Sequence, residues 1–172
     1  LVLDGGPCAV GIESTIVDLS RDDQPPRILR PGHITPEQIA AVMGVQLQAP
    51  TTQKDVATPR VSGSLDAHYA PRTPMRVVAA AQLMAVLAEL NRAGKSVGLL
   101  AHTAVSASCP AHAWCLLPDE PEGFARGFYA ALRELDQRDN DLIVAEAIPA
   151  GAGWMAVADR LRRAACGAAE SA

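Results

Sequence analysis

The sequence predicts an α/β protein that ends in a small Rossmann-like domain with a parallel sheet. From residue 75 onward, short aliphatic runs alternate with longer segments whose apolar residues recur every three or four positions. Strands separated by helices in this way pair in parallel through right-handed crossovers. Before residue 46, short extended runs are joined by turns, which favours antiparallel pairing. We therefore expect three regions: residues 1–45, a linker over residues 46–74, and a Rossmann-like domain over residues 75–172.

Three strands are expected in the first region. The runs 1–3, 14–19 and 27–30 are aliphatic or β-branched, and residues typical of turns follow each of them. The first run is short and apolar, so we expect it to be buried.

A helix is expected to follow the third strand. Thr35 is a suitable N-cap, Pro36 fits the first helical position, and Gln38 completes a capping box. Gly44 is predicted to end the helix. The apolar stripe of this helix includes Val42.

Four strands and three helices are expected after the linker. Each helix has an apolar face, such as that formed by Leu83, Leu87 and Leu90 in the first helix, which Gly94 is predicted to end. The predicted strands are 75–78, 96–101, 113–117 and 141–145, and the predicted helices are 80–92, 123–138 and 154–165.

Charge and composition narrow the class of protein. A net charge of −4 argues against a general nucleic-acid binder, so we do not expect direct binding of nucleic acid. No apolar run approaches the roughly 20 residues that a membrane helix needs, and no signal peptide is recognisable. The four cysteines are expected to be free thiols, and the protein to be cytoplasmic.

Ser14 and Thr15 are the first candidate binding residues. They follow three glycines, Gly5, Gly6 and Gly11, which let a backbone pass close to a ligand and expose amides to an anion. A tight hairpin without any ligand has the same spacing. From spacing alone, the hairpin is the favoured interpretation.

Arg30 and Tyr69 are candidate nucleotide contacts. Arg30 ends a strand before the rigid Pro31–Gly32 turn, where a guanidinium is well placed to bind phosphate, although a surface arginine is the commoner case. The linker is rich in Pro, Thr, Ser and Gly, and a histidine and Tyr69 lie near its end. This pair either closes over a nucleotide as a lid or anchors the linker by packing of the tyrosine.

Three further groups have a weaker claim to function. Cys109, His112 and Cys115 are metal-ligand types, but structural zinc needs four ligands, so no protein-bound metal is expected. The Gly151–Gly153 stretch lacks the full phosphate-loop pattern and is predicted as a loop. Three arginines of the last helix are expected to complement its C-terminal end rather than to bind nucleic acid: Arg160, Arg162 and Arg163.

Three stretches, in this order, resemble the threonylcarbamoyl-AMP synthase family in its two-domain, YrdC/Sua-type form: DGGPCAVGIESTIVDLS, RILRPGHIT and SGSLDAHYAPRTP. The α/β part also resembles that family's C-terminal domain, so the resemblance covers nearly the whole chain. It implies that residues 1–45 are the C-terminal part of a YrdC-like catalytic domain. In the family, the lysine/arginine and Ser-x-Asn motifs that hold the ATP phosphates come before these residues, and neither is found here.

The resemblance implies an L-threonylcarbamoyladenylate synthase, a nucleotidyltransferase that uses L-threonine, bicarbonate and ATP, releases diphosphate and serves the t6A37 modification of tRNA. Ser14 would contact threonine, Arg30 would contact the ATP phosphate or ribose, and Tyr69 would close over the nucleotide. No side chain is expected as a nucleophile, and Mg²⁺ would arrive with ATP. Ser64–Ala67 stands where one common form of the family has lysine and arginine before the His-Tyr pair, which argues against a positively charged lid.

We expect this chain to be inactive alone, because the principal phosphate-binding motifs are not found in it. The alternative function is a regulatory α/β module that binds other proteins of the tRNA-modification machinery.

Overall fold

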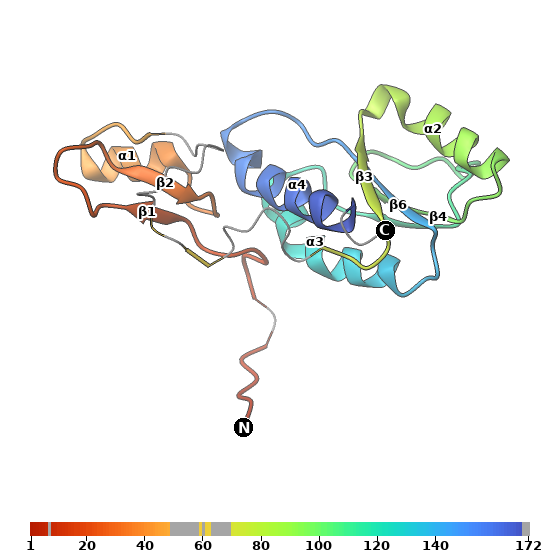
Figure 1. Ribbon diagram of the computed structural model, residues 1–172, viewed down its shortest axis with the longest axis horizontal. Coiled ribbons are helices and arrows are strands. Elements are labelled where there is room, and N and C mark those ends of the chain that lie inside the picture. Colours follow the sequence, from red (N-terminus) through yellow and green to blue (C-terminus); the bar gives the residue numbers. More distant parts are fainter. Residues whose placement is uncertain (7, 49–58, 60, 63–69, 170–172) are drawn as a thin grey trace.

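The computed structural model describes residues 1–6, 8–48, 59, 61–62 and 70–169. Figure 1 shows an elongated molecule, with a two-stranded sheet and helix α1 at one end and a four-stranded sheet with its helices at the other. We call residues 9–48 the hairpin unit and residues 70–169 the α/β unit. The four-stranded sheet is entirely parallel, which confirms the predicted α/β class.

The hairpin unit is built on strands β1 (Ile16–Asp18) and β2 (Arg27–Arg30), which pair antiparallel as predicted. Strand β1 is shorter than the predicted run 14–19. Gln48, which was assigned to the linker, adds a parallel bridge beside Arg27. Its carbonyl accepts a hydrogen bond from the backbone N–H of Ile28 at 3.2 Å, and Ile28 is the buried centre of this small sheet.

The predicted strand at Leu1–Leu3 is wrong. These residues form no strand, and their side chains are exposed. An extended segment becomes a strand only where a neighbouring backbone pairs with its N–H and C=O groups. None of the described residues offers that pairing here.

Helix α1 (Pro36–Met43) has the predicted capping box. The Thr35 hydroxyl accepts from the Gln38 N–H at 3.3 Å, and the Gln38 side chain accepts from the Thr35 N–H at 2.8 Å. Gly44 ends the helix with a φ of 69°, as predicted. No side chain of α1 is fully buried. In the predicted apolar stripe, Val42 is 88% exposed and Met43 is exposed, whereas Ile39 is half-buried.

The α/β unit has the strand order β3-β6-β4-β5. The predicted strands and helices are all present, within a few residues of the expected limits. A short 3-10 helix precedes the last helix where a loop was predicted. The strands are β3 (Met75–Val78), β4 (Val97–Ala101), β5 (Ala113–Leu116) and β6 (Leu142–Glu146), and the helices are α2 (Ala80–Arg92), α3 (Pro121–Asp136), η1 (Ala152–Trp154) and α4 (Met155–Ala169).

Two hydrophobic clusters cover the two faces of this sheet. Because successive side chains of a strand point to opposite faces, Leu99 and Val144 pack on the side of α2, whereas Leu100 and Ile143 pack on the side of α3 and α4. In Figure 1, α3 and α4 lie on the side of the sheet nearer the hairpin unit. Phe128 of α3 is fully buried, which contributes about 1.5–3 kcal/mol by transfer from water. Within the described residues, no helix is long and apolar enough to cross a bilayer.

Candidate functional site

The end of β2 brings Arg30 against Ser14. Arg30 lies opposite Ile16 in the hairpin register, so its side chain reaches the residues that precede β1. Its Nε donates to the Ser14 carbonyl at 3.1 Å, and its Nη2 donates to the Ser14 hydroxyl at 3.3 Å. Arg30 is only 7% exposed, whereas Ser14 is exposed. Two of the predicted site residues are therefore in contact, an exposed serine beside a buried guanidinium.

Arg30 also holds the linker. Its Nη1 donates to the carbonyl of Ser62 at 2.8 Å. Ser62 belongs to the stretch that leads to Tyr69, the third predicted site residue, which lies outside the described residues. The three nitrogens of one buried guanidinium thus join the segment before β1, the end of β2 and the linker.

The Pro31–Gly32 turn is packed directly on the backbone of residues 13–15. A Cβ at Gly32 would overlap the backbone of Ser14 and Thr15, so only glycine fits this position without a shift. The Thr15 hydroxyl donates to the carbonyl of Ile34 at 2.7 Å. These contacts hold residues 13–15 against residues 32–34, beyond the end of the β1–β2 hairpin.

Glu13 connects this site to the α/β unit. Its carboxylate accepts from Arg160 Nε of α4 at 2.6 Å and from the Tyr129 hydroxyl of α3 at 3.2 Å and 3.3 Å. Burial alone would raise the pKa of Glu13, but the hydrogen bond and charge of Arg160 and the Tyr129 hydroxyl hold this pKa below its ordinary value. Glu13 is therefore a carboxylate at neutral pH.

Arg160 was predicted to complement the end of the last helix, and that prediction is wrong. Its side chain is 3% exposed, and it also donates from Nη2 to the Pro31 carbonyl at 3.2 Å and from Nη1 to Asp159 at 2.6 Å. Burial would lower the pKa of Arg160, but the carboxylates of Glu13 and Asp159 raise it overall. Sequence reasoning missed this role because Glu13 and Pro31 lie far from Arg160 in the chain.

The loop before Glu13 is fitted onto helix α3. Gly11 has a φ of 81°, and a Cβ there would overlap the backbone of Ala125 and Arg126. Arg126 Nε donates to the Ala9 carbonyl at 2.9 Å, and Ile12 is buried in the core beneath α3 and α4. The glycine predicted to approach a ligand therefore approaches a helix instead.

A second polar cluster lies where strands β4 and β6 end. The Glu146 carboxylate accepts from the N–H groups of His102 and Thr103 at 2.9 Å and 3.0 Å, and from the Thr103 hydroxyl at 2.7 Å. The segment after β4 leads to β5 on one side of this pair, whereas the segment after β6 leads to α4, which contacts β3 on the other side. Ligands of open α/β sheets bind at such a point. Here the protein's own carboxylate already occupies both amides. We therefore favour the Ser14–Arg30 pair as the candidate substrate site.

The cysteine and histidine cluster of the sequence does not come together as a metal site. Cys115 Sγ contacts the Ala131 carbonyl, and burial together with the nearby Glu134 carboxylate raises the pKa of this thiol to about 11. His112 instead bonds Asn140 at 3.3 Å. In the part of the chain that the structure describes, no three His, Cys, Asp or Glu side chains are grouped as metal ligands.

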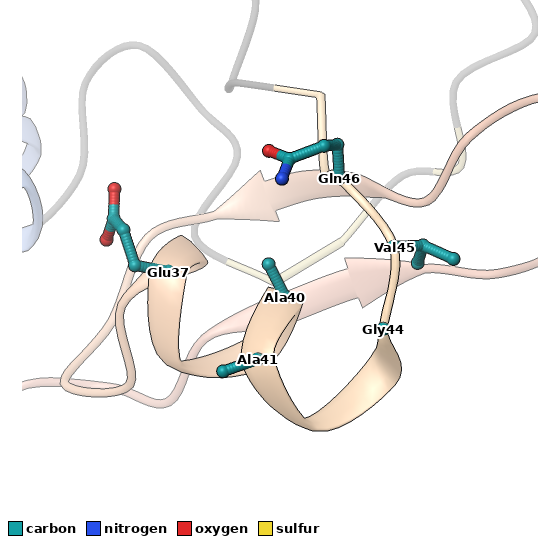
Figure 2. A pocket seen from close by; sticks show the side chains of 6 residues that line it. All are labelled: Glu37, Ala40, Ala41, Gly44, Val45 and Gln46. Carbon is teal, nitrogen blue, oxygen red and sulfur yellow. The ribbon is translucent and has the colours of Figure 1, made fainter.

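A surface hollow of about 360 Å³ lies beside α1, away from Ser14 and Arg30. Figure 2 shows Ala40 pointing to the side on which Gln46 lies, with Glu37 near the start of the helix. Small and apolar residues make up most of the lining, with no cluster of charge to hold a polar substrate. The lining residues are Glu37, Ala40, Ala41, Gly44, Val45 and Gln46.

The sequence pattern of one protein family, described as "Threonylcarbamoyl-AMP synthase, C-terminal domain", matches residues 34–166. The threonylcarbamoyl-AMP synthase of Pyrococcus abyssi is 33% identical over 170 residues, covering 95% of this chain and 48% of that protein. The threonylcarbamoyl-AMP synthase of Bacillus subtilis is 34% identical over 170 residues, covering 96% of this chain and 49% of that protein. The chain thus spans about half the length of the curated relatives it matches.

Solved structures agree with these relatives. The crystal structure of P. abyssi Sua5 complexed with L-threonine superposes with a TM-score of 0.80 at 31% identity, over 96% of this chain and 49% of that one. A variant of P. abyssi Sua5 in which a histidine and the following tyrosine are replaced by alanine gives a TM-score of 0.71 at 28% identity, over 96% of this chain and 48% of that one.

Proposed function

Because the chain belongs to the threonylcarbamoyl-AMP synthase family, we propose that it forms part of an enzyme that makes threonylcarbamoyl-AMP from L-threonine, bicarbonate and ATP, with release of diphosphate. This nucleotidyl transfer would serve the t6A37 modification of tRNA, in the cytoplasm. The substrates and the role in tRNA modification are those that the family implies. The P. abyssi protein bound to L-threonine supports threonine as the amino-acid substrate.

The observation that carries the proposal is the pairing of Ser14 with Arg30. We infer that the exposed Ser14 hydroxyl bonds the threonine and that Arg30, behind it, meets the ATP phosphate or ribose. A hydrogen bond from Arg30 Nη2 orients this hydroxyl, and the guanidinium adds positive charge where anionic substrates meet. Tyr69 would close over the nucleotide from the linker, which Arg30 already holds at Ser62.

The proposed chemistry requires positioning more than a protein nucleophile. The threonine amine and bicarbonate combine to a carbamate with loss of one water, and a carbamate oxygen then attacks the α-phosphorus of ATP and displaces diphosphate. Both reactants are anions, so the protein must hold them together and offset their charge. We assign these two tasks to Ser14 and Arg30, and we expect Mg²⁺ to enter with ATP as part of that substrate.

A further part of the proposal is that this chain is inactive alone. The family's phosphate-binding motifs are not found in its sequence, and the chain matches only about half of each curated relative. Without those residues, the triphosphate would lack most of its positive partners, whatever Arg30 contributes.

A pyrophosphate-release assay tests the proposal. This chain and a version extended by any coding sequence that precedes it are given ATP, L-threonine and bicarbonate. We expect turnover only in the extended protein, and only when threonine and bicarbonate are both present. Turnover by this chain alone would overturn its proposed dependence, and inactivity of both proteins would remove the enzymatic proposal.

A second candidate function, a partner-binding α/β module, is favoured by one observation. Trp114 and Leu116 on strand β5, at the edge of the sheet, are 50% and 54% exposed. An exposed tryptophan is typical of contacts between proteins. If this function is correct, the protein binds another t6A-pathway protein without nucleotide, and Trp114→Ala weakens that binding at least tenfold.

A further inference from the structure

We propose that Arg160 of helix α4 is a positioning residue for the substrate site, which it holds through the neighbours of Ser14 and Arg30. This inference rests on the proposed function, because it takes Ser14 and Arg30 to be the substrate contacts. It adds a task for the α/β unit, which is to set the shape of a site that lies in the hairpin unit.

The fork of Arg160 spans the two segments that carry the site. Its Nε donates to Glu13, the residue directly before Ser14, at 2.6 Å. Its Nη2 donates to the carbonyl of Pro31, the residue directly after Arg30, at 3.2 Å. One planar guanidinium therefore fixes the distance between the two site residues from behind, through their neighbours in the chain.

The hairpin does not fix this geometry by itself. Ser14 precedes β1, and the β1–β2 register is irregular between Ile16 and Val17, at the end of the strand nearer the site. The position of Ser14 therefore depends on side-chain contacts rather than on a regular ladder of backbone hydrogen bonds. Arg30 supplies one such set of contacts from within the hairpin unit, and Glu13 with Arg160 supplies the other from outside it.

The contact between Arg160 and Glu13, called the latch below, is largely buried and is not a surface ion pair. The Arg160 and Glu13 side chains are 3% and 21% exposed, and Tyr129 donates to the same carboxylate. A buried charge that loses its partner is strongly destabilising. A state in which Arg160 and Glu13 are separated but still buried is therefore unfavourable. Asp159 holds the third nitrogen of Arg160 and fixes the guanidinium on α4. Removal of Arg160 is therefore expected to free residues 13–15 and 31–34 locally.

The test compares Arg160→Ala with Arg162→Ala in the protein extended by any coding sequence that precedes this chain, called the full-length protein below. Arg162 lies on the same helix and contacts the same Asp159, but its side chain is 45% exposed and touches neither site segment. Arg160→Lys and Glu13→Gln serve as milder variants if the alanine variant fails to fold. Two readouts are taken: amide hydrogen exchange, and the calorimetric Kd for L-threonine.

We expect Arg160→Ala to speed amide exchange at residues 13–15 and 32–34 by roughly tenfold or more. We also expect it to weaken threonine binding by roughly 10- to 100-fold, since small displacements of positioned groups have effects of this size. Arg162→Ala should change neither readout, and Arg160→Lys should recover part of the affinity.

The two readouts separate this inference from the proposed function. Unchanged exchange and unchanged threonine affinity in Arg160→Ala would overturn the positioning role and leave the enzyme proposal intact. Faster exchange in a protein whose unaltered form binds no threonine would support the latch and remove the proposed function. Equal loss of threonine affinity in Arg162→Ala would also overturn the inference.

Discussion

Replacement of Glu146 is the perturbation whose effect the structure defines best. Its side chain is fully buried, and its two carboxylate oxygens accept different hydrogen bonds. Oε2 accepts from the backbone N–H groups of His102 and Thr103, and Oε1 accepts from the Thr103 hydroxyl. Glu146→Ala leaves all three donors without their acceptor. Glu146→Gln can keep its carbonyl oxygen on the two amides and turn its NH₂ toward the Thr103 hydroxyl, which can accept as well as donate.

The magnitudes follow from those contacts. The buried N–H of His102 costs about 1–3 kcal/mol when it loses its acceptor, whereas the donors of the exposed Thr103 cost less because water can replace the carboxylate. Glu146→Ala should therefore lower the free energy of unfolding by about 2–4 kcal/mol. Glu146→Gln keeps the geometry and loses only the charge, for which we expect about 1–2 kcal/mol, because bonds to charged groups are the stronger ones. The loss expected for Glu146→Ala is a large share of the roughly 5–15 kcal/mol that stabilises a typical domain.

Acidity provides a second readout. Burial alone would raise the pKa of Glu146, but the N–H and hydroxyl of Thr103 and the N–H of His102 hold it below the ordinary 4.5. A lowered pKa in the folded state stabilises the protein above the ordinary value, and this contribution is lost as the pH falls through the folded pKa. The difference between Glu146 and Glu146→Gln should therefore shrink on acidification.

Urea denaturation of the three proteins tests this reasoning, at neutral pH and at several values below about pH 4.5. Both tryptophans lie in the α/β unit, and the Trp154 ring centroid is 6.0 Å from that of His102, so fluorescence reports on this region. Equal losses for the Ala and Gln variants would refute the account of the hydrogen bonds. A difference between Glu146 and Gln that is the same at every pH would refute the account of the charge.

Three further predictions concern single positions. Gly11→Ala should destabilise the docking of the loop on α3, by more than the roughly 1–2 kcal/mol of a left-handed alanine because its Cβ also overlaps α3, whereas Gly5→Ala, with open space around it, should leave the thermal melting temperature unchanged; equal effects would contradict the packing. Thr35→Ala should cost about 1 kcal/mol at the start of α1, seen as faster amide exchange confined to that helix, and unchanged exchange would show that the cap does not matter. Cys8 is exposed and backbone N–H groups lower the pKa of its thiol, so at neutral pH iodoacetamide should label it much faster than Cys115, whose pKa is about 11; peptide mass spectrometry giving the reverse order would refute these assignments.

Local signals in the sequence predict most of the fold. The capping box of Thr35 and Gln38 and the final Gly44 involve neighbours a few residues apart, so the sequence alone specifies them. The apolar faces of the α/β helices are equally local, and Phe124 and Phe128 are buried as their spacing predicts. The largely exposed stripe of α1 shows that such spacing predicts a helix but not what covers it.

Contacts between distant residues account for what the sequence did not predict. Glu13 and Arg160 are separated by 147 positions, and neither has a local pattern that marks it. Glu146 is the last residue of a buried, otherwise aliphatic strand, where an acidic residue is a usable signal. Its partners, however, are set only by the order of the strands. The roles of Ser14 and Arg30 came from a family resemblance, because the residues alone favoured an empty hairpin at Ser14 and a surface arginine at position 30.

The measurement that tests the central claim most directly is a calorimetric titration of L-threonine into the full-length protein with Ser14 or with Ser14→Ala. Ser20→Ala is the matched control, since that exposed hydroxyl bonds only Asp18 in the described part of the chain. The account predicts that Ser14→Ala weakens threonine binding by roughly tenfold or more, as expected when a hydrogen bond to a charged or polar ligand group is lost, and that Ser20→Ala has no effect. Equal affinity of the Ser14 and Ser14→Ala proteins for threonine would contradict the claim that this hydroxyl, set by Arg30, binds the substrate.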